Sequence, residues 1–102
     1  MKIAVIGAGT IGLFILQAAK LRGAKTAIAC DLNEFRLDLA RQVGADVRLN
    51  PGQVDLKEEI CRRTDGRGAD VAFEAVGFAE TFRQAISITR TGGTVTAVGN
   101  LQ

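Results

Sequence analysis

The fold is decided by an N-terminal stretch that reads KIAVIGAGTIG, residues 2–12. Its apolar run at residues 3–6 is closed by a glycine, which predicts a short buried strand followed at once by a tight turn. The glycines form the pattern GxGxxG: Gly7 allows the turn, Gly9 lets a pyrophosphate approach the backbone, and Gly12 lets helix and strand pack closely. The stretch therefore predicts a strand–turn–helix unit of the kind that binds dinucleotides.

A helix is predicted to follow the glycine turn, over residues 10–22. Its apolar residues recur at helical spacing and are Ile11, Phe14, Ile15, Ala18 and Ala19. The backbone amides of Thr10 and Ile11 lie in the first turn, where they have no intrahelical partner. Because the positive end of the helix dipole lies at the same place, these two amides are predicted to donate to a phosphate.

The alternation of strand and helix continues along the chain. Apolar runs predict further strands at residues 26–30, 47–49, 71–76 and 94–98. Helical spacing and capping residues predict further helices at residues 33–44, 55–63 and 79–90. Such alternation is typical of an α/β fold with one doubly wound, Rossmann-like parallel sheet, here of five strands and four helices in the order 3-2-1-4-5. We expect a single domain over residues 1–102 that lacks the sixth strand usual in dinucleotide folds.

Composition excludes several classes of function. The 102 residues carry 13 Lys and Arg against 11 Asp and Glu, a net charge of +2 that argues against a dedicated nucleic-acid or membrane-surface binder. The absence of His removes Ser-His-Asp and Cys-His catalysis and every His-containing metal site. Cys30 and Cys61 are too few for a thiolate zinc site and are expected as buried thiols of a cytoplasmic protein. No charged leader or membrane-length apolar run is present, so neither secretion nor membrane insertion is expected.

A carboxylate follows the second predicted strand at the distance typical of ribose recognition. Asp31 lies 19 residues after Gly12, close to the ~20-residue spacing at which an acidic side chain accepts hydrogen bonds from the adenosine ribose. A 2′-phosphate about 4 Å away would be repelled by roughly 4 kcal/mol at an effective dielectric constant near 20. The sequence therefore predicts NAD in preference to NADP. The alternative is that Asp31 is a helix cap or a solvated turn residue.

Several separated motifs resemble one protein family. They lie at residues 7–12, 16–20, 31–33, 39–46, 66–71, 74–77 and 92–95. Together they are similar to the coenzyme-binding domain of zinc-type medium-chain alcohol and polyol dehydrogenases, and the similarity covers nearly the whole chain. The resemblance implies transfer of a hydride from an alcohol or polyol to NAD. It also implies further coenzyme contacts from Leu32, Arg36, Ala75, Val76, Val98 and Gly99.

The resemblance assigns these residues to different parts of the coenzyme. Arg36 is expected beside the adenosine ribose, although a surface charge in the first turn of a helix is the alternative. Ala75 and Val76 are expected to line the adenosine and nicotinamide-ribose side. Val98 and Gly99 are expected to approach the nicotinamide ring.

In the family that the chain resembles, a second domain supplies the ligands of a catalytic zinc, and none of that domain is present. We therefore expect this chain to bind NAD, to hold no metal and no catalytic residue, and to be inactive by itself. One alternative is a nucleotide-sensing regulatory domain built on the same glycine motif, and another is a folded scaffold that binds nothing. The open edge of the fifth strand also predicts pairing with a second copy of the chain.

Glu74 ends an apolar strand close to the predicted site. One interpretation is a catalytic group with a shifted pKa. The interpretation that we favour is a hydrogen bond to a neighbouring loop, because buried polar groups in proteins are nearly always paired.

Overall fold

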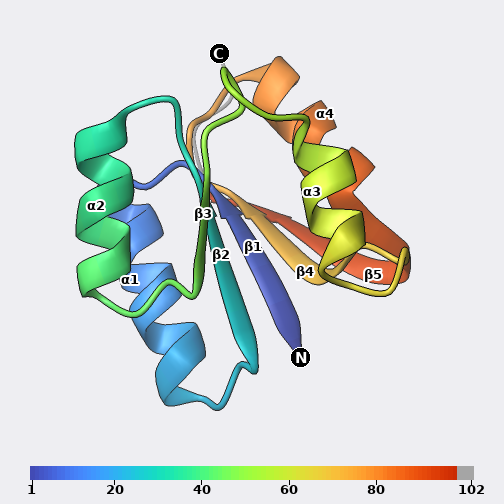
Figure 1. Cartoon of the computed structure of the whole chain (residues 1–102), viewed down its shortest axis with the longest axis horizontal. Coiled ribbons are helices and arrows are strands. Elements are labelled where there is room, and N and C mark those ends of the chain that lie inside the picture. The colour runs from blue at the N-terminus through green and yellow to red at the C-terminus, as the bar shows by residue number, and fades with distance from the viewer. Residues whose placement is uncertain (99–102) are drawn as a thin grey trace.

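The computed structural model describes residues 1–98, in which five strands alternate strictly with four helices. The strands are β1 (Lys2–Ile6), β2 (Thr26–Cys30), β3 (Val47–Leu49), β4 (Ala69–Glu74) and β5 (Thr89–Ala97). The helices are α1 (Thr10–Leu21), α2 (Glu34–Gln42), α3 (Leu56–Arg62) and α4 (Ala79–Ile88). Figure 1 shows one sheet between two helical layers, with α1 and α2 on one face and α3 and α4 on the other.

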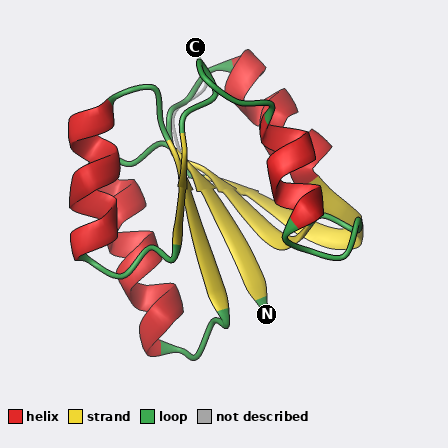
Figure 2. Ribbon diagram, viewed as in Figure 1, coloured by secondary structure: helices red, strands yellow, loops and turns green. Residues whose placement is uncertain are grey.

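The strands form one parallel sheet in the order β3-β2-β1-β4-β5. This confirms the predicted doubly wound α/β fold and its strand order. β1 lies at the centre because its side chains are apolar on both faces: Ile3 and Val5 belong to one core cluster, and Ala4 and Ile6 to the other. Figure 2 shows the same layers coloured by element type.

Part of the predicted apolar stripe of α1 packs against the core, as at Ile15 and Ala19, and part faces outward. Within the helix the buried residues are Gly12 and Leu16, whereas Ile11 is 55% exposed and Phe14 is 66% exposed. The reason is steric, because a Cβ atom placed on Gly12 would lie 1.8 Å from the carbonyl oxygen of Gly7. The helix therefore turns its glycine toward β1, which leaves part of its apolar stripe facing outward.

The last helix is shorter than predicted, and β5 is longer. α4 ends at Ile88, and Thr89 already pairs with Ala69 of β4. Close packing at this point excludes a side chain, because a Cβ atom on Gly68 would lie 2.9 Å from the carbonyl oxygen of Ile88. A register shift in the β4–β5 pairing then accommodates the residues between Thr89 and Thr94.

The predicted caps of α2 and α3 are both present. The Asn33 side chain accepts a hydrogen bond from the Arg36 amide at 3.1 Å. The Asp55 side chain accepts one from the Glu58 amide, also at 3.1 Å. Each cap satisfies one of the amides that a helix N-terminus leaves free, so these two boundaries follow from local sequence.

Asp70 ties three strands together at the amino ends of the sheet. Its carboxylate accepts a hydrogen bond from the Lys2 backbone amide of β1 and another from Arg90 Nε of β5, both at 2.7 Å. The bond from the Lys2 amide, followed by the bond from Arg90, lowers the pKa of the Asp70 carboxyl below its ordinary value. The ionised form of Asp70 therefore stabilises the folded chain.

We expect Asp70→Asn to reduce the free energy of unfolding at pH 7 by about 1–2 kcal/mol, because Asn keeps one acceptor but loses the charge. The native chain should also lose stability as the pH falls below about 4. The folded pKa of Asp70 is lowered, so the unfolded chain takes up the proton first. Urea unfolding followed by circular dichroism at pH 7 and pH 3 measures both effects.

Asp65→Asn is the matched control, because Asp65 is exposed and makes no side-chain hydrogen bond within residues 1–98. Stability that depends on pH to the same extent in the Asp70→Asn and Asp65→Asn variants would contradict this role of Asp70.

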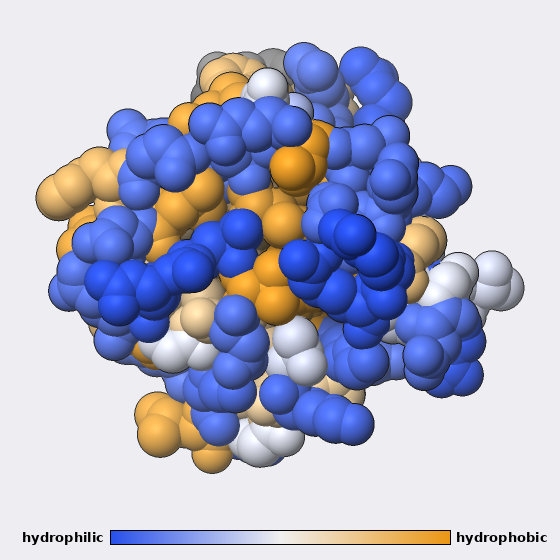
Figure 3. All heavy atoms as spheres, viewed as in Figure 1, coloured by the Kyte–Doolittle hydropathy of each residue, from blue (hydrophilic) through white to orange (hydrophobic). Residues whose placement is uncertain are grey.

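Figure 3 shows the face on which the edge strand β3 lies. Polar residues cover most of this face, and apolar residues gather in the middle, between the two helical layers. None of the helices within residues 1–98 has the length and apolar character needed to cross a membrane.

Candidate functional site

A cavity lies at the carboxyl ends of the strands. It has a volume of about 730 Å³ and is bounded by residues that follow β1, β2, β3 and β4. The chain reverses its direction across the sheet between β1 and β4, which lie side by side. In open α/β sheets this switch point is where ligands bind.

The glycine turn forms one wall of the cavity. Gly7 has a φ of +102°, and a Cβ atom there would lie 2.8 Å from Val76 Cγ2 and 3.2 Å from the Ala75 carbonyl. These contacts confirm the tight turn predicted at Gly7, and the contact between Gly12 and Gly7 confirms the close packing of helix and strand. A Cβ atom on Gly9 would meet nothing within 4 Å, so the backbone there is open to a ligand.

The first turn of α1 is left without side-chain partners. α1 begins at Thr10, and its N-cap Gly9 provides no side-chain hydrogen bond. No acidic side chain lies in the first turn, and Thr10 and Ile11 are exposed. The helix dipole therefore stays uncompensated here, as an anion-binding terminus requires.

Asp31 bridges the glycine turn and the start of α2. Its Oδ2 atom accepts from the Ala8 amide and its Oδ1 atom from the Asn33 amide, both at 2.8 Å. The side chain is only 9% exposed. Asn33, not Asp31, is the N-cap of α2. Asp31 is thus neither a helix cap nor a solvated turn residue, and its oxygens keep lone pairs for further donors.

Arg36 lies beside this carboxylate. Its Nη1 atom is 3.8 Å from Asp31 Oδ2, and its side chain is 54% exposed. Arg36 also lines the cavity, as does Leu32. Both residues are therefore within the predicted site, and Arg36 has the freedom to move toward a ligand.

The remaining predicted contacts lie along the β4 side. Val76 lines the cavity, and Ala75 lies behind it against Gly7. Val98 is outside the cavity lining, and its amide donates to the Glu74 carbonyl at 2.8 Å. Gly99 lies outside the described residues.

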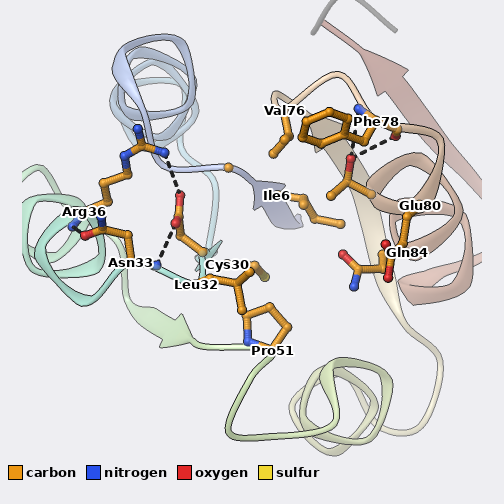
Figure 4. A pocket seen from close by; sticks show the side chains of 13 residues that line it. Ile6, Cys30, Leu32, Asn33, Arg36, Pro51, Val76, Phe78, Glu80 and Gln84 are labelled. Atoms are coloured by element: carbon orange, nitrogen blue, oxygen red, sulfur yellow. Dashed lines mark hydrogen bonds and ion pairs between the residues drawn. The ribbon is translucent and has the colours of Figure 1, made fainter. Parts of the chain in front are cut away.

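Sequence reasoning missed several residues that line the cavity. They are Ile6, Cys30, Asn33, Pro51, Phe78, Glu80, Thr81 and Gln84. Pro51 follows β3, and Glu80, Thr81 and Gln84 lie on α4; Figure 4 shows Pro51, Glu80 and Gln84 facing the cavity. The sequence could have indicated these residues only by their place after a predicted strand, because the segments that follow the strands of a parallel sheet meet at one edge.

Glu74 is fully buried and holds the loop that follows β4. Its Oε1 atom accepts from the amides of Val76 and Gly77 and from the Thr81 hydroxyl. This confirms the predicted hydrogen bond to a neighbouring loop. Its Oε2 atom is buried and has no hydrogen-bond partner within the described chain.

Cys30 is buried beneath the cavity and is free. Burial, with a smaller contribution from the charge of Asp31, raises the pKa of the Cys30 thiol to about 12. The reactive form of cysteine is the thiolate, so Cys30 is a packing residue at neutral pH.

The residues present do not fit a zinc ion. Residues 1–98 contain no group of three His, Cys, Asp or Glu side chains that could hold a metal. The sequence has no His at all. Catalytic zinc sites use three protein ligands and an open position, so nothing in this part of the chain supplies one.

Comparison with known proteins identifies the family. Residues 10–102 match the family model described as zinc-binding dehydrogenase. An alcohol dehydrogenase of Cupriavidus necator is 43% identical over 97 residues, which are 95% of this chain and 26% of the relative. The chain thus spans about a quarter of the length of such relatives.

Two solved structures are similar in fold. The alcohol dehydrogenase TADH from Thermus sp. ATN1 has a TM-score of 0.93 at 38% identity, over 96% of this chain and 29% of that one. A zinc-binding dehydrogenase from Sinorhizobium meliloti, solved with NADP bound, has a TM-score of 0.92 at 36% identity, over 98% of this chain and 30% of that one. These similarities favour the dehydrogenase over the nucleotide-sensing alternative. By sequence and by fold, the chain belongs to the zinc-binding dehydrogenase family, in which it corresponds to the coenzyme-binding domain.

Proposed function

We propose that this chain binds NAD in the cavity at the carboxyl ends of its strands. It would serve as the coenzyme-binding part of a dehydrogenase that oxidises an alcohol or a polyol. The observation that carries the proposal is the position of Asp31, whose nearly buried carboxylate lies at the end of β2 and hydrogen-bonds to the glycine turn. When bound, NAD supplies the acceptor for the hydride.

Each part of the site has a role toward the coenzyme. The open backbone at Gly9 and the free amides of Thr10 and Ile11 would receive the pyrophosphate. Asp31 would accept hydrogen bonds from the adenosine ribose hydroxyls, and the exposed Arg36 would lie beside that ribose. Leu32 and Val76, which line the cavity, would contact the adenosine. Ala75, with Val76, stays a prediction for the adenosine and nicotinamide-ribose side, and Val98 and Gly99 stay predictions for the nicotinamide ring.

The same carboxylate supports a preference for NAD over NADP. A 2′-phosphate at the ribose position would approach Asp31, and repulsion at about 4 Å costs roughly 4 kcal/mol at an effective dielectric constant near 20. Arg36 offsets part of this repulsion, because its guanidinium is 3.8 Å from Asp31 Oδ2. Arg36 is mostly exposed, so water and salt screen its contribution.

Calorimetric titration of the chain with NAD, ADP-ribose and NADP tests the proposal. We expect NAD and ADP-ribose to bind and NADP to bind at least about tenfold more weakly, since tenfold corresponds to only about 1.4 kcal/mol. Asp31→Ala should weaken NAD binding and remove the preference. Equal affinity of the native chain for NAD and NADP would refute the role of Asp31 in specificity. Titrations that Asp31→Ala leaves unchanged would favour a scaffold that binds nothing at this site.

Three further expectations concern association of the chain, its location and its activity in isolation. Within the described residues the outer edge of β5 has no paired strand, which supports association of two copies through that edge. Sedimentation over a wide concentration range measures this association, and a monomer at every concentration would contradict it. A cytoplasmic location and the inactivity of the isolated chain also stay predictions.

A further inference from the structure

α4 directs two polar side chains into the cavity. Glu80 and Gln84 are four residues apart, so they lie on the same face of the helix, and both line the cavity. Figure 4 shows them across the cavity from Arg36 and Asn33. Neither side chain makes a hydrogen bond or an ion pair within residues 1–98. The cavity wall opposite the ribose position therefore carries a free carboxylate and a free carboxamide.

The walls between these two sides are largely apolar. Figure 4 shows Leu32 and Pro51 on one side of the cavity and Val76 and Phe78 on another. Such surfaces suit the faces of a purine ring. In adenosine the ribose is joined at N9, and the 6-amino group and N1 lie on the far edge of the base. A ribose held at Asp31 therefore turns this polar edge toward α4.

The charge of Glu80 indicates which kind of ligand group it can bind. Glu80 is exposed and lies in the first turn of α4, where the helix dipole favours a negative charge, so its carboxylate stays ionised and can accept a hydrogen bond from a donor on a ligand. The 6-amino group of adenine is such a donor. The Gln84 carboxamide offers a donor and an acceptor together, which match N1 and the 6-amino group of that edge.

We propose that Glu80 and Gln84 recognise the 6-amino edge of adenine and select against 6-oxopurine dinucleotides. This inference rests on the proposed function, because it requires the ribose at Asp31. In hypoxanthine the 6-position is a carbonyl oxygen, which faces the Glu80 carboxylate as one acceptor faces another. At the 6-position the result is a missing hydrogen bond and an electrostatic repulsion, whereas the N1 proton of hypoxanthine is a donor next to it, so the preference depends on Glu80 facing the 6-position.

Titration with ADP-ribose and its hypoxanthine analogue, inosine diphosphate ribose, tests the inference, because the bases differ only at the 6-position and the adjoining N1 proton. We expect the 102-residue chain to bind ADP-ribose about tenfold more tightly, the lower end of the discrimination given by a good bidentate pair. Glu80→Gln should bring the two affinities close together, because its amide can donate to the 6-oxo group. Gln84→Ala should reduce the preference by weakening ADP-ribose binding.

The matched control is Glu58→Gln, which removes the same charge from an exposed position on α3 outside the cavity lining. This control should retain the full preference. Equal affinity of the native chain for both compounds, or a preference that Glu80→Gln leaves undiminished, would overturn the inference. In that case binding that still depends on Asp31 leaves the proposed function intact. Failure of the native chain to bind either compound would overturn both.

Discussion

The Gly12→Ala variant will unfold at a much lower urea concentration than the native chain. A Cβ atom at this position would lie 1.8 Å from the Gly7 carbonyl oxygen, so α1 must move away from β1. Glycine to alanine inside a helix normally stabilises by about 1 kcal/mol. The steric conflict reverses the sign, and we expect a loss of about 3 kcal/mol in the free energy of unfolding, the upper end for overpacked cores. Circular dichroism is the suitable signal, because the chain has no Trp or Tyr.

Gly9→Ala is the matched control within the same turn. Its Cβ atom would meet no atom within 4 Å, and the φ of −76° at this position suits alanine. We expect its stability to stay within about 0.5 kcal/mol of the native value. Its affinity for ADP-ribose should fall at least about tenfold, because the added methyl group takes the space predicted for the pyrophosphate.

The Gly12→Ala and Gly9→Ala variants therefore test helix packing and coenzyme binding separately. A Gly12→Ala variant as stable as the native chain would contradict the close packing of α1 on the glycine turn. A Gly9→Ala variant that binds ADP-ribose normally would contradict the approach of the pyrophosphate to this backbone.

Removal of the Glu74 carboxylate will have the second large effect. In Glu74→Ala the amides of Val76 and Gly77 and the Thr81 hydroxyl all lose their shared acceptor, and two of these hydrogen bonds hold the loop that follows β4. Buried donors left unpaired cost about 1–3 kcal/mol each, and the losses are not additive, so we expect about 3 kcal/mol in total. ADP-ribose binding should weaken as well, since Val76 lines the cavity.

Glu74→Gln distinguishes hydrogen bonding from simple loss of volume. Its amide oxygen can accept from the same three donors, and its NH2 group takes the place of Oε2, which has no partner within the described chain. We therefore expect Glu74→Gln to lose less than half of what Glu74→Ala loses in urea unfolding. Equal losses in the two variants would show that the acceptor at Oε1 does not hold the loop.

The sequence by itself determined the fold and the centre of the site. Apolar runs, helix caps such as Asn33 and Asp55, and the alternation of elements predicted the doubly wound sheet and its strand order, which the structure confirms. The apolar runs and caps are local signals that depend on residues a few positions apart, whereas the strand order follows from the alternation of elements and the right-handed crossover rule. The glycine turn and the spacing of Asp31 likewise predicted which end of the sheet carries the site.

Tertiary structure alone decided how these parts meet. Phe14 belongs to the predicted apolar stripe of α1 but is 66% exposed, because the close contact of Gly12 with the Gly7 carbonyl decides which face of the helix meets β1. α4 ends at Ile88 because β5 pairs with β4 from Thr89 onward. The hydropathy pattern does not indicate whether the residues after Ile88 extend the helix or pair as a strand. Pro51, Glu80 and Gln84 reach the cavity from segments distant in sequence. Their convergence depends on the packing of strands and helices, which no local pattern specifies.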